Sequence, residues 1–335
     1  MGTRMRFASI VTVVLLLQAT MVMSAGRTER PADPVVQMRI ASTGGSSSLR
    51  GDALRFFQEE LESRTDGRMT VRLYLDAQLG GDEENTFQLQ EGSVEAIFNG
   101  TAPHFMFGEE MGIEYWPFVF DSPNHLIAFY ESSDYVASVD EMLINEFGIR
   151  PLVLATRGPR HITSNRPVES PDDLRGMRFR APGLDVVIQA FEALGADVVG
   201  MPLTELVGAM QAGLVDGQEN PVDNIYSWGL YEVQDYLSLT YHTYSGRMLY
   251  VNEAFWQGLP ADLQDAVVST AEDMADFIRA RIEETDQENL TRMEQAGMTI
   301  LEVDVESFRS AFENSITVLP QTYQELYWEI RELSY

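Results

Sequence analysis

The 335-residue chain contains no cysteine and no lysine, and only four histidines. Without cysteine it has no disulfide, no thiolate nucleophile and no cysteine-bound zinc. Without lysine it has no P-loop lysine, no pyridoxal phosphate Schiff base and no lysine-dependent aldolase chemistry. Several classes of enzyme and of cofactor are therefore excluded.

The histidines give no sign of a catalytic or metal site. No HExxH spacing and no GxSxG turn occurs, and no second histidine lies within a helical turn of another. The four are His104, His125, His161 and His242. The sequence therefore predicts no catalytic residues, no cofactor and no metal, although a site built from Asp and Glu alone stays open in so acidic a chain.

Basic residues are scarce as well. The 52 acidic residues outnumber 23 arginines and give a net charge of −29. Such a chain is repelled by nucleic-acid backbones, so we expect no nucleic-acid partner. The 44% hydrophobic content supports one or two globular domains with real cores.

The one long apolar run lies at the N-terminus. Arg4 and Arg6 precede the apolar residues 7–23, and Ser24-Ala25 supplies small residues for cleavage. Residues 1–25 are typical of a secretory signal peptide, with a retained membrane anchor as the alternative. The polar residues 26–34 then read as a linker. We expect the mature protein to be periplasmic.

Strand and helix patterns alternate along the rest of the chain, which predicts an α/β fold. The expected strands are 35–41, 69–75, 94–98, 149–155, 177–180, 197–199 and 214–218. The expected helices are 49–64, 82–90, 123–147, 183–194, 203–212, 260–296 and 305–333.

Three of these elements carry further expectations. Strand 149–155 is almost wholly apolar, which is typical of a sheet covered on both faces. Helix 260–296 has almost no breaker and would be roughly 50 Å long, so we expect it to lie across two lobes. Pro320 should kink the last helix.

Residues 157–180 contain six arginines but only three acidic residues. Arginine grips a carboxylate with two parallel hydrogen bonds and keeps its charge when desolvated. Pairing with nearby Asp and Glu is the alternative for most of them. Arg180 differs because it ends a strand, directly before Ala181-Pro182-Gly183, and open α/β sheets bind ligands at strand ends.

A second polar cluster also leaves a strand. Gln218, Glu219 and Asn220 come directly before Pro221. An amide at this place can donate to a carboxylate, whereas a turn with local side-chain-to-backbone bonds is the alternative reading.

Several motifs, in order, resemble one family. These are Gln78-Leu-Gly80, Ser164-Asn-Arg166, Asp173-Leu-Arg-Gly-Met-Arg-Phe-Arg-Ala-Pro182, Ala209-Met-Gln-Ala-Gly-Leu-Val-Asp-Gly-Gln-Glu-Asn-Pro221, Tyr231-Glu-Val-Gln234 and Leu259-Pro-Ala-Asp-Leu-Gln264. The mature chain resembles the DctP-type solute-binding proteins of tripartite ATP-independent periplasmic (TRAP) transporters. The resemblance implies a type II-like periplasmic binding fold, with two lobes, a ligand cleft between them, a hinge and a long helix that spans both.

The resemblance also implies bounds for the two lobes. We expect lobe I at 35–157 plus 246–285, and lobe II at 158–245 plus 286–335.

The resemblance assigns roles to individual residues. Arg180 matches the arginine that clamps the ligand carboxylate, and Asn220 matches the asparagine beside it. Arg160 matches a second carboxylate-facing arginine, with Arg157 as the competing choice. Further residues expected in the cleft wall are Glu219, Asn99, Thr101, Ser46, Trp116, Gly183, Leu203 and His242. Gly100 occupies the place of a glutamate found in sialic-acid-binding members, which argues against that ligand.

The polar residues around 99–104 and 218–220 favour a hydroxylated monocarboxylate such as a sugar acid, with a C4-dicarboxylate close behind. The resemblance implies integral membrane subunits as partners, an ion gradient rather than ATP as the energy source, and a monomer. A periplasmic partner of a sensor, or a carboxylate-processing enzyme, are the alternatives.

Overall fold

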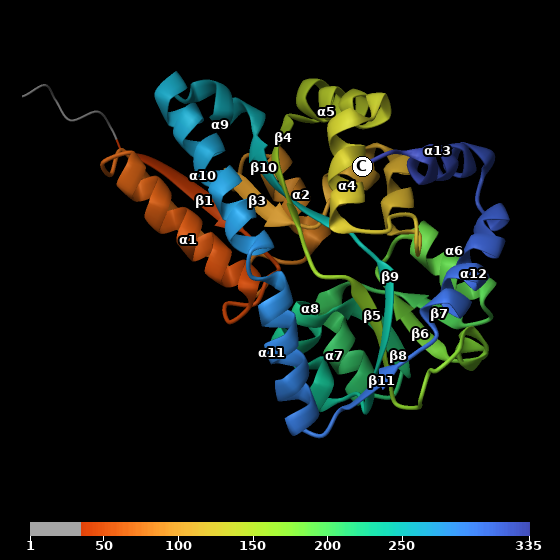
Figure 1. Ribbon diagram of the computed structural model, residues 1–335. Helices are drawn as coiled ribbons and strands as arrows, with labels where there is room; N and C mark the ends of the chain where they lie inside the picture. The colour runs from red at the N-terminus through yellow and green to blue at the C-terminus, as the bar shows by residue number, and fades with distance from the viewer. Residues whose placement is uncertain (1–34) are drawn as a thin grey trace, which may run out of the picture. The chain divides into compact units, whose positions relative to one another are not determined.

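Two β-sheets organise residues 35–335, the part of the chain that this computed structural model describes (Figure 1). The first sheet has the strand order β2-β1-β3-β10-β4, and the second has the order β11-β9-β5-β8-β6-β7. The strands of the first sheet are β1 (Val36–Ala41), β2 (Met69–Tyr74), β3 (Ala96–Asn99), β4 (Ile149–Thr156) and β10 (Gly246–Asn252). Those of the second are β5 (Arg160–Ser164), β6 (Arg178–Ala181), β7 (Asp197–Gly200), β8 (Gly217–Pro221), β9 (Tyr236–Thr243) and β11 (Thr299–Glu302). The predicted signal peptide and linker lie outside the described residues.

Each sheet mixes parallel and antiparallel pairs. β1 runs parallel to β2 and β3, whereas β10 runs antiparallel to β3 and β4. In the second sheet β6 runs parallel to β7 and β8, and β5 runs antiparallel to β8 and β9. The chain passes from β4 into β5 through residues 157–159, and returns from β9 to β10 through residues 244–245. These two connections are short, whereas a third runs from β10 to β11 through α9, α10 and α11.

Helices follow most strands, as the alternating pattern predicts. They are α1 (Leu49–Arg64), α2 (Asp82–Gln90), α3 (Ala102–Phe107), α4 (Pro123–Ser132), α5 (Asp134–Phe147), α6 (Asp185–Ala193), α7 (Leu203–Gln211), α8 (Val222–Ser227), α9 (Glu253–Gly258), α10 (Ala261–Arg279), α11 (Ile282–Gln295), α12 (Val305–Ser315) and α13 (Gln321–Glu332). Short 3₁₀ segments are η1 (Glu109–Tyr115), η2 (Pro171–Leu174), η3 (Leu230–Glu232) and η4 (Ile316–Val318). The expected helix 49–64 is confirmed with its bounds.

Local chemistry explains where α1 begins and which face it buries. The side chain of Ser48 accepts a hydrogen bond from the Gly51 amide and caps the helix. Leu54, Phe57 and Leu61, at spacings of three and four, are all fully buried against the first sheet and α10. The sequence pattern therefore positions α1 correctly.

The prediction of one unbroken helix over 260–296 is wrong. The helix ends at Arg279, the Arg281 amide donates to the Ile278 carbonyl in a tighter turn, and α11 begins at Ile282. The apolar stripe changes at the same place, because α10 packs on α1 and β4 whereas α11 packs on α8 (Figure 1). Two consecutive helices that bury different faces replace the single spanning helix.

Three smaller expectations also need correction. The helix expected at 123–147 divides at Ser133, which caps α5. The C-terminal helix does not merely kink at Pro320 but ends before it and restarts as α13. Residues 150–154 of β4 are only half-buried, because β4 lies at the edge of its sheet with β10 as its one strand partner.

The hydrophobic core does not separate along the expected lobe bounds. One buried cluster contains Ile97 from β3 of the first sheet together with Phe179 from β6 of the second. Helix α13 contacts η1, which follows β3 in the chain. Residues 35–335 form a single compact unit, so the division at 157/158, 245/246 and 285/286 stays a prediction.

Trp116 belongs to this core, since its side chain is 0% exposed. We expect Trp116→Ala to lower the free energy of unfolding by about 3–5 kcal/mol, because it removes a large buried aromatic group. Trp328→Ala is the matched control, since Trp328 is 52% exposed, and it should change stability by less than about 0.5 kcal/mol. Urea unfolding followed by circular dichroism measures both. Equal effects of the two substitutions would contradict the core assignment.

Candidate functional site

A cleft of about 490 Å³ collects residues from the ends of strands in both sheets. Its lining includes Thr43, Arg50, Gly81, Asp82, Glu83, Glu84, Gly100, Ala102, Phe105, Glu109, Tyr115, Arg157, Arg160, Arg180, Gly183, Leu184, Asp185, Leu203, Thr204, Asn220, Asn224 and Tyr323. Arg180, Arg160, Asn220, Gly183 and Leu203 were expected from the sequence, and all five contribute to this lining.

Arg180 lies in β6, one residue before the strand ends, and its side chain lines the cleft. Its side chain is buried, and its Nε and Nη2 both donate to the carbonyl of Met201, at 2.9 and 2.7 Å. Burial lowers its pKa to about 10, a change that the charges of Glu219 and Asp82 oppose. The group therefore stays cationic at neutral pH. Within residues 35–335 no carboxylate lies close enough to form an ion pair with it, and an unpaired buried charge is costly.

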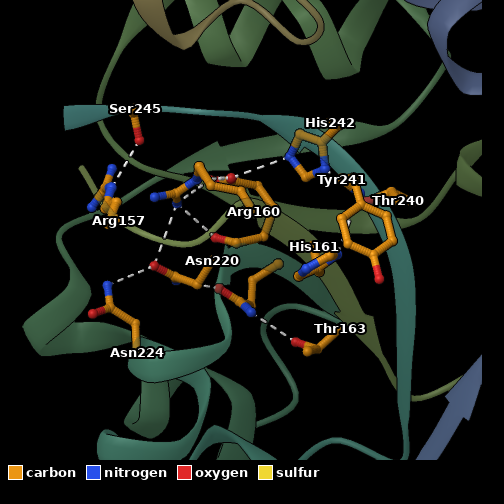
Figure 2. Close-up of polar contacts among 12 residues, drawn as sticks. Arg157, Arg160, His161, Thr163, Asn220, Asn224, Thr240, Tyr241, His242 and Ser245 are labelled. Atoms are coloured by element: carbon orange, nitrogen blue, oxygen red, sulfur yellow. Dashed lines mark hydrogen bonds and ion pairs between the residues drawn. The ribbon is translucent and has the colours of Figure 1, made fainter. Parts of the chain in front are cut away.

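Arg160, at the start of β5, is held differently. It forms an ion pair with Glu219, and its Nη2 donates to Oε1 of Glu219 at 2.6 Å and to the Glu219 carbonyl at 2.9 Å (Figure 2). Burial alone would raise the pKa of Glu219, but the charge and hydrogen bonds of Arg160, together with the contact to His242, outweigh burial and lower that pKa to about 2. Glu219 therefore orients the Arg160 guanidinium, and Glu219 does not itself line the cleft.

Asn220 is fixed by a chain of side-chain hydrogen bonds (Figure 2). Its Nδ2 donates to Oε1 of Gln218, and Gln218 in turn donates to Thr163 at 2.8 Å. Its Oδ1 accepts from Nδ2 of Asn224 at 3.0 Å and from Nη2 of Arg160 at 3.4 Å. The strand-end cluster predicted from the sequence is thus an ordered network, and Asn220 and Asn224 line the cleft.

Arg157 and Arg160 both reach the cleft, so the sequence-based choice between them was unnecessary. The Nε of Arg157 donates to Ser245 at 2.8 Å, and its guanidinium lies 5.9 Å from the ring centre of Tyr115. Burial lowers the pKa of Arg157 to about 10. It also has no carboxylate partner within ion-pair distance in the described part of the chain.

Helix α8 connects this network to the first sheet. Oδ1 of Asp223 accepts from the Leu49 amide at 3.1 Å, and its Oδ2 lies 3.3 Å from Nη2 of Arg247. Nη2 of Arg50 donates to Oδ1 of Asn224 at 3.2 Å. Side chains that follow β8 therefore hold the start of α1 and the strand β10. Sequence reasoning missed Arg50, Asp223 and Asn224, because only tertiary structure brings them together.

The other expected wall residues lie outside the cleft lining. Asn99 accepts from the Thr43 amide at 2.9 Å, Thr101 donates to Glu114 at 2.6 Å, and the Ser46 amide donates to Asp76 at 2.7 Å. Trp116 is in the core, and His242 lies behind Glu219, with Nε2 3.4 Å from Oε2. Asn99 and Thr101 therefore form hydrogen bonds with neighbouring residues and do not themselves line the cavity.

The basic and the acidic side chains of the cleft lining differ in burial. All four arginines of the lining, at positions 50, 157, 160 and 180, are buried. The acidic residues of the lining, Asp82, Glu83, Glu84, Glu109 and Asp185, are all exposed. We call these two groups the cationic floor and the acidic rim. Sequence reasoning missed the rim, although three of its members follow one another at the start of α2.

No histidine lines the cleft. His104 is instead held by Tyr250 and Asp140, at 2.5 and 2.7 Å. Within residues 35–335 no three His, Asp or Glu side chains come together as a metal site, and no helix there is long and apolar enough to cross a membrane. The cleft therefore offers buried guanidinium groups without carboxylate partners among the described residues, an arrangement that suits an anion.

Comparison with known proteins identifies the family. Residues 40–325 match the model for bacterial extracellular solute-binding protein, family 7 (DctP). The chain is 32% identical over 260 residues to a solute-binding protein of Roseobacter denitrificans, which covers 78% of this chain and 79% of that one. It is 29% identical over 291 residues to the C4-dicarboxylate-binding periplasmic protein DctP of Rhodobacter capsulatus, which covers 85% of each.

A solved structure extends this likeness to the fold. The crystal structure of a TRAP periplasmic solute-binding protein from Roseobacter denitrificans, with bound L-galactonate, matches with a TM-score of 0.82 at 27% identity, over 89% of this chain and 99% of that one. The chain therefore belongs to the DctP family of solute-binding proteins, and the predicted two-lobe periplasmic binding fold is confirmed. The family and the fold are those of transport proteins.

The buried pair of Arg160 and Glu219 predicts a particular response to pH. The folded-state pKa of Glu219 lies below its ordinary value of 4.5, so its stabilising effect is complete above pH 4.5 and is lost as the pH falls toward 2. We expect Glu219→Gln to reduce the free energy of unfolding at pH 7 by about 3–5 kcal/mol, since Arg160 loses its charge partner. This difference from wild type should shrink steadily between pH 4.5 and 2.

Denaturant unfolding across this pH range tests the prediction. Glu169→Gln removes an exposed carboxylate that has no side-chain partner in the described structure, and it should track wild type at every pH. A Glu219→Gln difference that does not change with pH would contradict the assignment of the ion pair.

Proposed function

We propose that this protein is the extracytoplasmic receptor of a TRAP transporter, that it captures a small hydroxylated monocarboxylate such as a sugar acid, and that it delivers this acid to the membrane subunits. The observation that carries the proposal is the buried guanidinium of Arg180, which lines the cleft without a carboxylate partner. An organic acid that enters the cleft supplies the missing anion.

The geometry of the floor supports a carboxylate clamp. Nε and Nη2 of Arg180 are held by the Met201 carbonyl, so the orientation of the guanidinium is fixed, and Nη1 has no hydrogen-bond partner among residues 35–335. Arg160 is oriented by Glu219, and Asn220 adds an amide beside it. Charge-assisted hydrogen bonds are worth about 1.5–3 kcal/mol each. A carboxylate bound by two of them is held by roughly 3–6 kcal/mol.

The acidic rim supports a ligand with one carboxylate rather than two. A hydroxyl group donates to an exposed carboxylate, whereas a second ligand carboxylate at the rim is repelled by it. The Roseobacter relative was solved with L-galactonate, a polyhydroxylated monocarboxylate.

A C4-dicarboxylate is the second candidate. It is favoured by Arg157, a second buried guanidinium without an anion, and the Rhodobacter relative is a C4-dicarboxylate-binding protein.

Thermal unfolding with added acids tests the function. The set is L-galactonate, D-gluconate, D-erythronate, D-glucuronate, succinate and L-malate. An acid present at 100 times its Kd stabilises the folded state by about 2.7 kcal/mol, which raises Tm by roughly 5–10 °C. We expect at least one hydroxylated monocarboxylate to do so. If none of the acids shifts Tm, the proposed function is wrong.

Substitution of the clamp gives a second test. We expect Arg180→Gln to weaken the binding of the best acid at least 100-fold by calorimetry, since about 3 kcal/mol or more of charge-assisted bonding is lost. Arg175→Gln is the control, because Arg175 is exposed, outside the cleft, and pairs only with Asp172. Equal affinity of wild type and Arg180→Gln for the acid would show that Arg180 does not bind it.

A further inference from the structure

The first turn of α2 places three consecutive carboxylates at the cleft, and two of them, Asp82 and Glu84, are each oriented by a hydrogen bond to one oxygen. Glu84 folds back and accepts from the Gly81 amide at 2.9 Å. Asp82 is oriented by Thr43, whose Oγ1 donates to Oδ1 at 3.0 Å. Its Oδ2 has no hydrogen-bond or ion-pair partner among residues 35–335, and the side chain is exposed in the cleft lining.

Asp82 lies within electrostatic reach of the cationic floor without touching it. Its charge acts on the guanidinium groups of both Arg180 and Arg50. No ion pair joins it to either arginine, so each carboxylate–guanidinium separation exceeds the 4.0 Å limit of a salt bridge. Thr43 bridges Asp82 and Arg50, since it also accepts from Nη1 of Arg50 at 3.0 Å. We expect the ligand to lie in the space between the buried Arg180 guanidinium and the Asp82 carboxylate.

Asp82 and Arg180 lie on elements that belong to different sheets, and this defines the orientation of the bound molecule. Arg180 lies near the end of β6 in the second sheet, whereas Asp82 begins α2, which follows β2 and precedes β3 of the first sheet in the chain. A ligand whose carboxylate meets Arg180 therefore presents its carbon chain toward Asp82. A carboxylate accepts hydrogen bonds and donates none, so it suits a hydroxyl and opposes a second carboxylate.

We propose that Asp82 is a specificity-determining residue of this site: its free oxygen accepts a hydrogen bond from a hydroxyl on the ligand chain, and its charge excludes acids with a second carboxylate. The inference rests on the proposed function, since it presupposes a ligand carboxylate at Arg180. It selects polyhydroxylated monocarboxylates over dicarboxylates of the same length. Neither Arg180 nor Arg160 can make this distinction, because both respond to the carboxylate that the two classes share.

Matched pairs of acids isolate the effect, because the members of each pair differ only in whether the far end is CH₂OH or COO⁻. The pairs are L-galactonate with galactarate, D-gluconate with D-glucarate, and D-erythronate with meso-tartrate. Calorimetry gives Kd for each acid with wild type, with Asp82→Asn and with Glu59→Gln. Glu59 is an exposed acid of α1 outside the cleft, so its substitution removes the same charge without touching the site.

We expect wild type to bind the monocarboxylate of at least one pair 10-fold or more tighter than its partner. Asp82→Asn should reduce this ratio at least 10-fold, partly by weakening the monocarboxylate and partly by strengthening the dicarboxylate. Glu59→Gln should leave the ratio unchanged. Asp82 is exposed, and circular dichroism should show a Tm for Asp82→Asn close to that of wild type without ligand.

Two outcomes would overturn the inference while leaving the role of Arg180 intact. One is an unchanged ratio in Asp82→Asn, which includes an equal weakening of both members of a pair, and the other is a wild type that prefers the dicarboxylates. Failure of the proposed function looks different, because wild type would then bind no acid of either class.

Discussion

The structure of the cleft depends on one electrostatic constraint, a guanidinium that is buried at a strand end with no anion beside it. Arg180 is only 2% exposed, and the Met201 carbonyl satisfies two of its donors but not its charge. A buried cation without a counter-ion destabilises the unliganded protein, and a ligand carboxylate removes that cost. The proposed affinity for an organic acid therefore rests on how the fold holds this side chain.

Other parts of the cleft are arranged around that constraint. Glu219 pairs with Arg160, which leaves Arg50, Arg157 and Arg180 as the arginines of the floor without a carboxylate partner among residues 35–335. Asn220 and Asn224 then connect the floor to Arg50 on α1, so side chains after β8 of the second sheet contact the first sheet directly. The same contacts that orient the site also join the two sheets.

Local sequence patterns predicted the first four strands, β6 to β8 and most helices, but not β5, β9, β10 and β11. Arg180 and Asn220 could be placed at the cleft because each lies one residue before the end of a strand. Helix α1 could be placed from an apolar stripe. Arg160 depended on the resemblance to a family, since nothing in its neighbourhood distinguishes it from Arg157. Arg50 and Asp82 were missed because each looks like an ordinary helix residue until tertiary structure brings Thr43 between them. The break at residues 280–281 was missed for the same reason, since α10 and α11 differ in what they pack against.

The most direct measurement of the central claim is a crystal structure of the protein with the acid that raises Tm most. The account predicts both carboxylate oxygens of that acid in the cleft, with at least one of them about 2.7–2.9 Å from a guanidinium nitrogen of Arg180, as in charge-assisted hydrogen bonds. A bound acid whose carboxylate lies away from Arg180, or an Arg180 side chain turned into bulk solvent, would contradict it.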